Sequence, residues 1–295
     1  MKLKEFNILK NVWIALKEFV HDEGLDKSSI LALYSIFSTL FLLTFFTFVF
    51  TKFLGNPNTA IEGMYPFSSD FFSKISPELF RKAQDVSTKL REIGILGILF
   101  FVFLSFLVIK KVVQFVNEMF NIKLKEKKSE KGFLTRRISE VSLLFVMGSL
   151  LVISFLFSGF ISTFTTLFHE NQFIATHIHP GFIEFLDTFL VTYVAPFLIS
   201  LLFFFVLYKW IPEKKVYVKG AFIAAIISTV LWEIIKRAYT YYLVNVSFVW
   251  EIRGPIIAII LFGFWMQISM SIMLYGAKLT YIFDREKNDK IKKNN

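Results

Sequence analysis

The segment TVLWEIIKRAYTYYL, residues 229–243, places Glu233, Lys236 and Arg237 inside an otherwise apolar run. On a helix, residues three and four apart share a face, so this carboxylate lies beside both cations in a polar stripe that also contains Thr229. Such a stripe can bind an anionic ligand through the cations while the carboxylate holds them or carries a proton. It can equally be a structural ion pair that locks two helices together. The sequence leaves both interpretations open.

Four further polar residues in or beside apolar runs are weaker candidates for a site. Tyr34 and Ser38 are four apart and would form a polar patch or hydrogen-bond between helices. Asp187 opens a run in which Pro196 is expected to produce a kink. Lys278 lies near the end of the last apolar run, where its ammonium is expected to reach the lipid headgroups.

The sequence offers little to a hydrolytic enzyme. It has no cysteine and only four histidines. Three of these, His169, His177 and His179, fall in one connection, but their spacing matches no defined zinc motif. Because no nucleophile with a base within reach can be assembled, we expect no catalytic residues, no metal site and no cofactor.

The composition is that of a membrane protein. Of the 295 residues, 55% are hydrophobic and 39 are Phe, and the mean hydropathy is +0.58. Apolar stretches of about 18 residues or more are typical of membrane-spanning helices, since lipid offers the backbone no hydrogen bonds. We therefore predict an all-α, polytopic membrane protein with six transmembrane helices. The spans are expected at residues 28–51, 93–116, 138–168, 182–208, 217–244 and 255–282.

The basic residues indicate how the chain is oriented. Lys and Arg, which give a net charge of +10, concentrate in the N-terminal piece, the second and fourth connections and the C-terminal tail. Under the positive-inside rule both termini then face the cytoplasm. We expect the basic excess to touch the anionic headgroups of membrane lipids, and we expect no nucleic acid partner. A homo-oligomer is left open.

Two segments are expected to form amphipathic helices that do not cross the membrane, because apolar residues recur at helical spacing among charged ones. Each can lie in the membrane interface or pack on the bundle as an ordinary amphipathic helix, and the sequence favours packing on the bundle. One is a cytoplasmic N-terminal segment, residues 1–27, and the other lies at about 76–93 in the first outer connection. The transmembrane domain is expected at 28–283, followed by a basic cytoplasmic tail at 284–295. The predicted apolar face of the N-terminal helix consists of Phe6, Leu9, Val12, Trp13, Leu16, Phe19 and Val20.

The fifth span sorts its residues around the helix. Beside the polar stripe lies a face of small residues, which would permit close contact with another helix. A third face is expected toward lipid or Phe side chains. The small face consists of Gly220, Ala221, Ala224, Ala225 and Ser228, and the third face of Ile223, Ile227, Val230 and Ile234. This sorting predicts that the polar stripe faces the interior of the bundle.

The stretches GAFIAAIISTVLWEIIKRAYTYYL (220–243) and GPIIAIILFGFWMQISMSIMLYGAKL (254–279) contain Gly-Ala at 220–221, Trp-Glu-x-x-Lys at 232–236 and Gly-Ala at 276–277 and, more loosely, ALYSIFSTLF (32–41) contains Ala-x-Tyr followed by Ser38. They resemble the YihY/BrkB-like family of bacterial inner-membrane proteins. The residues that match the family pattern are Ala32, Tyr34, Ser38, Gly220, Ala221, Trp232, Glu233, Lys236, Gly254, Trp265, Gly276 and Ala277.

The chain departs from the family pattern at three positions. Phe41 replaces a common Pro, Arg253 replaces the usual Tyr, and Lys278 replaces the usual Glu. Arg253 adds a cation to the candidate site residues. The change of sign at Lys278 removes any carboxylate chemistry from that position, and a Lys278 that faced the bundle would pair with a carboxylate.

The resemblance implies a six-span, multi-pass protein of the bacterial inner membrane. The family has been linked to envelope integrity, serum resistance and the movement of anionic lipids, and a ribonuclease label that some members carry finds no support in these residues. We expect a transporter or flippase-like carrier of an anionic amphipathic substrate such as a lipid. The alternatives are a non-transporting structural or assembly factor of the cell envelope and a membrane-bound hydrolase or nuclease.

Overall fold

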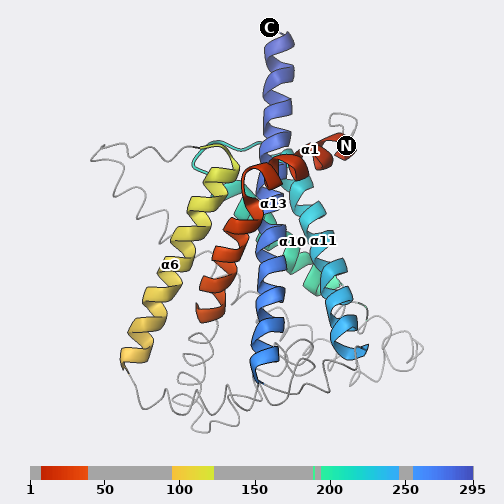
Figure 1. Cartoon of the computed structure of the whole chain (residues 1–295). Coiled ribbons are helices and arrows are strands. Elements are labelled where there is room, and N and C mark those ends of the chain that lie inside the picture. The colour runs from red at the N-terminus through yellow and green to blue at the C-terminus, as the bar shows by residue number, and fades with distance from the viewer. Residues whose placement is uncertain (1–7, 39–94, 123–188, 190–193, 246–254, 295) are drawn as a thin grey trace, which may run out of the picture.

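The structure is a computed structural model that describes residues 8–38, 95–122, 189, 194–245 and 255–294 (Figure 1). The described residues are helical except for short turns, and no strand occurs among them. This agrees with the predicted all-α class. The predicted third span, the outer amphipathic helix at 76–93 and the three histidines of residues 169–179 lie outside the described residues.

The helices correspond to the predicted spans where the two can be compared. In chain order they are α1 (Ile8–His21), a helix at 24–38, α6 (Ile95–Met119), α10 (Ala195–Trp210), α11 (Val218–Asn245) and α13 (Pro255–Asn294). The helix at 24–38 contains the start of the first predicted span, and α10 the second half of the fourth. α6, α11 and most of α13 correspond to the second, fifth and sixth.

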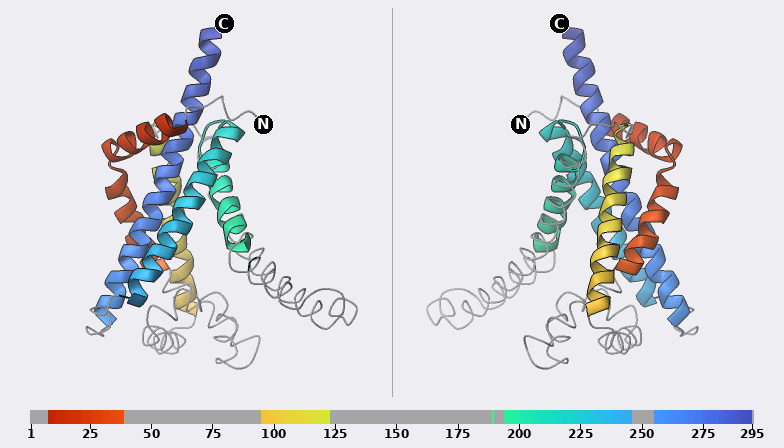
Figure 2. Two further views of the ribbon diagram at one scale, coloured as in Figure 1. Left: turned by 90° about the vertical axis from the view of Figure 1, so that its right-hand side faces the viewer. Right: turned by 90° about the vertical axis from the view of Figure 1, so that its left-hand side faces the viewer.

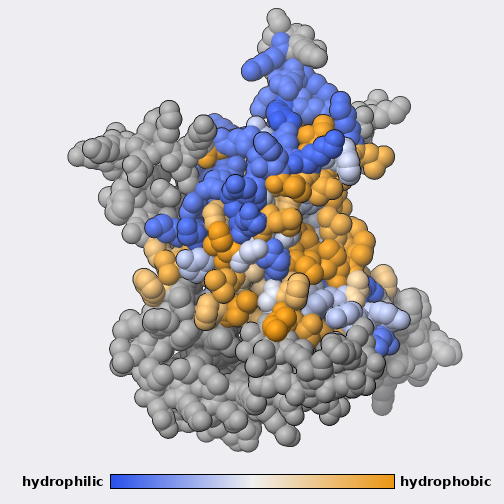
Figure 3. Space-filling model, viewed as in Figure 1, coloured by the Kyte–Doolittle hydropathy of each residue, from blue (hydrophilic) through white to orange (hydrophobic). Residues whose placement is uncertain are grey.

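The surface of the bundle is zoned as a membrane requires. Two described helices are long and apolar enough to cross a membrane, Val218–Leu243 within α11 and Ile260–Lys292 within α13, and the apolar stretch Pro196–Trp210 is shorter. Figure 3 shows hydrophobic surface over the middle of the bundle and hydrophilic surface where α1 and the C-terminal part of α13 lie. The number of six spans and the cytoplasmic placement of both termini stay predictions.

The start of α10 and the end of α13 follow from their sequences. Pro196 lies in the first turn of α10, where its missing N–H leaves no helical hydrogen bond unmade. Most residues before it are outside the described ones, so the expected kink stays a prediction. α13 continues beyond the predicted end of the last span, through the basic tail to Asn294. An ion pair of 2.7 Å between Glu286 and Lys290, one turn apart, supports this extension.

α11 packs on α10 and on α13 through its face of small residues. The side chains of Ala221, Ala224, Ala225 and Ser228 are fully buried, and Gly220 is buried beside Phe283. This confirms the predicted contact face. The opposite face is mixed: Val230 and Ile234 are exposed as expected, whereas Ile223 is buried in the core.

Three helices approach one another most closely at Gly276 of α13. The buried hydroxyl of Tyr208 on α10 donates to Ser228 Oγ on α11 at 2.8 Å. A Cβ atom added at Gly276 would lie 1.9 Å from the Tyr208 hydroxyl oxygen and 2.1 Å from Ser228 Oγ. Only glycine, which has no side chain, therefore allows α13 to pass directly over this hydrogen bond.

α1 lies across one end of the bundle, which we call the α1 end, and the helix at 24–38 then runs along the bundle (Figures 1 and 2). The turn between them contains Glu23, whose φ of 57° lies in the left-handed region, followed by Gly24. A Cβ at Gly24 would lie 2.2 Å from the ring of Phe19. Glycine at this corner therefore lets the two helices turn tightly over a buried aromatic ring.

Candidate functional site

The polar stripe of α11 lies along one edge of the helix rather than at the centre of its buried face. Thr229 is fully buried, and its hydroxyl donates to the backbone oxygen of Ala225 at 2.8 Å. The side chain of Glu233 is 14% exposed, that of Lys236 is 31% exposed, and Arg237 is exposed. The carboxylate is therefore sheltered, while the cations can be reached from outside the described bundle. The predicted inward orientation of the stripe thus holds for Thr229 and Glu233 but not for Arg237, because the stripe runs along the edge of the helix contact.

The carboxylate and one of the cations form an ion pair inside α11. Lys236 Nζ donates to Glu233 Oε1 at 2.7 Å, three residues apart on the same helix. Thr240, one turn further on, donates its hydroxyl to the backbone oxygen of Lys236 at 2.9 Å. Within the described part of the chain this ion pair lies inside α11 and joins no second helix.

Aromatic rings fix the rotation of α11 against α13 at the level of the stripe. The ring centroids of Trp232 and Trp265 are 5.1 Å apart, and those of Tyr239 and Trp265 are 5.2 Å apart. The Tyr239 hydroxyl also donates to the backbone oxygen of Leu261 at 2.6 Å. Because these contacts hold one face of α11 on α13, the neighbouring polar stripe is turned to the side.

The structure does not bring the other candidate residues to this stripe. Tyr34 and Ser38 are half-buried on the helix at 24–38. Figure 1 shows that helix on one side of α13 and α11 on the other, so α13 separates them. Asp187 and Arg253 lie outside the described residues and stay candidates from the sequence.

The expectation that Lys278 reaches the lipid headgroups is wrong. Its side chain is fully buried and forms an ion pair with Asp22 at 2.5 Å. Lys278 Nζ also lies 3.4 Å from Asn121 Oδ1 and 4.9 Å from the centre of the Tyr281 ring. The turn after α1 brings a carboxylate onto α13, so the ammonium finds its partner inside the protein. Lys278 lies about two helical turns from the level of Glu233 and is no part of the stripe.

Ion pairs between helices gather around Lys278 at the α1 end. The Asp22–Lys278 pair is joined by Arg285–Glu18 at 2.8 Å and by Lys27–Glu118 at 3.3 Å. We call Glu18, Asp22, Lys27, Glu118, Lys278 and Arg285 the N-terminal ion-pair cluster. The cluster ties α1 and the helix at 24–38 to α6 and α13. Partly exposed pairs contribute little to stability, so the buried Lys278 dominates its energetics.

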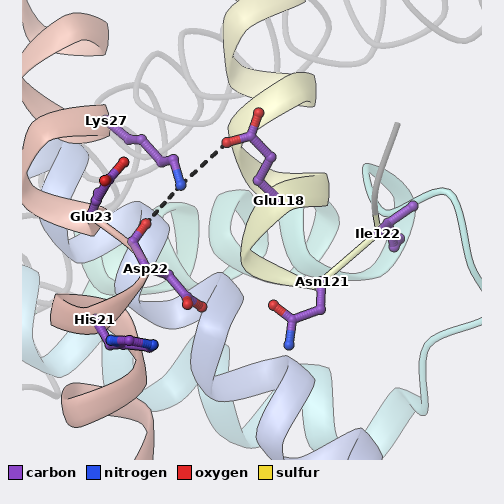
Figure 4. Close-up of a pocket in the computed structure, with 7 residues that line it drawn as sticks. All are labelled: His21, Asp22, Glu23, Lys27, Glu118, Asn121 and Ile122. Atoms are coloured by element: carbon purple, nitrogen blue, oxygen red, sulfur yellow. Dashed lines mark hydrogen bonds and ion pairs between the residues drawn. The ribbon is translucent and has the colours of Figure 1, made fainter. Parts of the chain in front are cut away.

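A pocket of about 300 Å³ opens beside the N-terminal ion-pair cluster (Figure 4). Lys27 closes part of its wall, because Lys27 Nζ donates to the backbone oxygen of Asp22 at 2.6 Å and pairs with Glu118. The lining residues are His21, Asp22, Glu23, Lys27, Glu118, Asn121 and Ile122. No group of three or more His, Cys, Asp or Glu side chains suited to a metal ion occurs in the described part of the chain.

Of the N-terminal ion-pair cluster, the sequence pattern singled out Lys278 alone. It singled out none of the residues that line the pocket. Two signals for them exist in the sequence. One is the charged turn HDEGLDK at 21–27, which contains a helix-breaking glycine, and the other is the lone lysine in the last apolar run. Nothing in the spacing of either segment indicates that the two meet.

Comparison with known proteins decides the family. The family model for virulence factor BrkB matches residues 15–295. The chain belongs to the BrkB family. A UPF0761 membrane protein of Legionella pneumophila (strain Corby) is 22% identical over 284 residues, which cover 96% of this chain and 64% of the relative. Another from Acinetobacter baylyi is 23% identical over 295 residues, which cover 98% and 67%.

The chain thus spans about two thirds of the length of these relatives. A shorter match joins it to a UPF0761 membrane protein of Alteromonas mediterranea, 35% identical over 95 residues and 32% of each chain. No solved structure matches the chain. With its relatives named as membrane proteins and two helices suited to crossing a bilayer, this BrkB-family chain is an integral membrane protein.

Proposed function

We propose that this BrkB-family protein is a transporter or flippase-like carrier that moves an anionic amphipathic molecule, such as a lipid, across the bacterial inner membrane. Lys236 and Arg237 bind the anionic group of the substrate, and Glu233 holds the cations or carries a coupling proton. The proposal assigns the protein no catalytic residue and no cofactor.

The proposal rests on how exposure changes along the polar stripe, from the buried Thr229 through the sheltered Glu233 to the exposed Arg237. A charge at the centre of a membrane helix costs about 2.5–3.5 kcal/mol, so a chain retains it only with compensation or a function. The Glu233–Lys236 ion pair offsets part of that cost. Arg237 leaves the three residues with a net positive charge on the accessible side of the stripe. An anionic headgroup is attracted to exposed cations of this kind.

A non-transporting structural factor is the second candidate, and the N-terminal ion-pair cluster is the observation that favours it. The cluster joins four helical segments at one end of the bundle. A scaffold protein needs such links. The Glu233–Lys236 pair, by contrast, links no two of the described helices, and the exposed Arg237 beside it suits an anionic ligand. We therefore place transport first.

The test is movement of a fluorescent anionic lipid in liposomes that contain the purified full chain. Removal of both cations in Lys236→Ala/Arg237→Ala takes away charge-assisted contacts to the substrate, and we expect the rate to fall about tenfold or more. The matched control is Lys215→Ala/Lys292→Ala, which removes two exposed lysines outside the stripe and should keep the wild-type rate.

Gel filtration and thermal unfolding in detergent show whether each variant folds. A folded Lys236→Ala/Arg237→Ala protein that moves lipid as fast as the wild type would exclude the proposed role of the stripe. A wild-type protein that moves no lipid faster than protein-free liposomes would favour the structural factor.

A further inference from the structure

α1 carries two apolar faces where the sequence predicts one. Ala15 and Phe19 are buried against the bundle, and the backbone oxygen of Val12 accepts a hydrogen bond of 3.1 Å from the Tyr275 hydroxyl of α13. The other apolar residues of α1 point away from the bundle. They are Leu9, Trp13, Leu16 and Val20, with 83%, 59%, 42% and 57% of their surfaces exposed. At 3.6 residues per turn these four lie within an arc of roughly 60°.

The exposed face is flanked by basic residues. Lys10 and Lys17 are both exposed, and the helical spacing places them beside the apolar arc, on the side away from the buried face. Lys17 Nζ lies 5.5 Å from the centre of the Trp13 ring. The acidic residue of α1 is turned the other way, because Glu18 pairs with Arg285 of α13 at 2.8 Å. The outward surface of α1 is therefore apolar with a cationic edge.

The position of α1 matches this surface to a lipid boundary. α1 lies across the end of the bundle rather than along it (Figures 1 and 2), at the end where hydrophilic surface replaces hydrophobic surface (Figure 3). A helix with an apolar arc, a lysine edge and an outward Trp is suited to the interface of a membrane, where acyl chains meet headgroups.

We propose that the outward face of α1, made of Leu9, Trp13, Leu16 and Val20 with Lys10 and Lys17, binds the anionic headgroup layer of the leaflet at the α1 end. The apolar side chains enter the upper acyl region, and the two ammonium groups lie among lipid phosphates. Charge complementarity selects an anionic lipid surface as the occupant over a second copy of the chain or a soluble partner. The proposal stands whether or not the protein transports lipid.

Binding of α1 to the lipid surface is coupled to the core of the bundle through hydrogen bonds and ion pairs. Asn11 donates to Glu286 of α13 at 2.5 Å, and Asp22, just after α1, pairs with the buried Lys278. These contacts join α1 to α13 on the side opposite the exposed arc. A leaflet that holds α1 therefore also sets the depth of α13, against which α11 and its polar stripe are packed.

The chain has no cysteine, so single cysteines can carry a fluorophore without a background. We would label Leu16→Cys on the outward face and Asp289→Cys on the exposed C-terminal part of α13. The full-length proteins are reconstituted in vesicles of phosphatidylcholine, with or without phosphatidylglycerol. We expect spin-labelled lipid to quench the Leu16→Cys label more than iodide does, and iodide to dominate at Asp289→Cys. Iodide dominating at both positions would overturn the proposal.

The charge of the lipid is tested in the same Leu16→Cys background. Lys10→Gln/Lys17→Gln should lower the ratio of lipid to iodide quenching roughly twofold or more in vesicles with phosphatidylglycerol, with little change in phosphatidylcholine alone. The control Lys215→Gln/Lys292→Gln should leave the ratio unchanged. A quenching ratio that changes neither on removal of the two lysines nor on removal of phosphatidylglycerol would refute binding to anionic headgroups. Cross-linking between Leu16→Cys chains that persists on dilution into excess lipid would assign this face to a second copy instead.

Discussion

Lys278 and Asp22 form an ion pair in which the two charged side chains are buried to different extents. The Lys278 side chain is fully buried, whereas that of Asp22 is 27% exposed and borders the pocket. Removal of one partner from a buried pair leaves the other charge without compensation, but water can still reach Asp22. The two halves of the pair therefore differ in what their loss does to the fold.

We expect Asp22→Asn to lower the free energy of unfolding by about 3–5 kcal/mol, because it leaves the Lys278 ammonium buried without its carboxylate. Lys278→Met should cost about 1 kcal/mol or less, since an apolar side chain of similar length suits the site. Lys290→Met, which breaks a pair whose lysine is 53% exposed, is the surface control and should be nearly neutral. Thermal unfolding in detergent measures all three, and equal losses from Asp22→Asn and Lys278→Met would contradict the asymmetry.

The contrast between two lysines shows what sequence can predict at this scale. The pairing of Lys236 with Glu233 follows from a spacing of three residues on one helix, and the structure contains it. The partner of Lys278 comes from the turn after α1, at the far end of the chain. Helical periodicity relates residues within one segment only, so it cannot identify a contact that depends on how distant segments pack.

Helix packing at the scale of the elements depends on how closely α13 approaches α10 and α11. Small residues form the contact face of α11, and Gly276 forms the matching gap on α13. Membrane helices usually gain van der Waals contact in this way, because the hydrophobic effect does not drive apolar helices together in lipid. Sequence predicted the small face of α11 from its periodicity. It did not reveal that Tyr208 and Ser228 meet over Gly276, because three helices contribute to that point.

Gly276→Ala should therefore destabilise the bundle strongly. The added methyl group would overlap two buried hydroxyl groups, and overpacking of this kind costs about 1–3 kcal/mol or more. Gly263→Ala on the same helix is the matched control, because its nearest neighbour, Ile36 Cδ1, would lie at an ordinary contact distance of 3.7 Å. We expect Gly263→Ala to be neutral or slightly stabilising. Melting temperatures in one detergent compare the two, and similar values would show that the helices can move apart at Gly276.

At the scale of the whole molecule, the amphipathic pattern predicted that α1 lies where polar and apolar surface meet. It did not predict which apolar residues of α1 pack on the bundle and which point away from it. Seven apolar positions at helical spacing indicated one face. Phe6 lies outside the described residues, and the structure divides the other six, because α13 covers the side that contains Phe19 and leaves Trp13 exposed. A pattern of hydrophobicity does not distinguish burial in protein from burial in lipid, so α1 is the element for which sequence was least decisive.

The orientation of the bundle in the membrane gives a last prediction, which combines the zoned surface with the basic residues. The apolar stretch of α11 is long enough, at about 1.5 Å per residue, to separate Lys215 from Asn245 by a full bilayer. Lysines cluster just before α11, so the positive-inside rule places that end in the cytoplasm. The C-terminal part of α13 lies at the same end, so Asp289 should share its compartment.

Single cysteines in the cysteine-free chain test this arrangement with a maleimide that does not cross membranes. Asn245→Cys should react in cells whose inner membrane is intact. Lys215→Cys and Asp289→Cys should react only after that membrane is opened, and all three should react in detergent. Opposite labelling would invert the bundle and move the proposed α1 docking to the outer leaflet. Equal labelling of Lys215→Cys and Asn245→Cys in intact cells would mean that α11 does not cross the bilayer, in which case its charged stripe needs no partner in lipid.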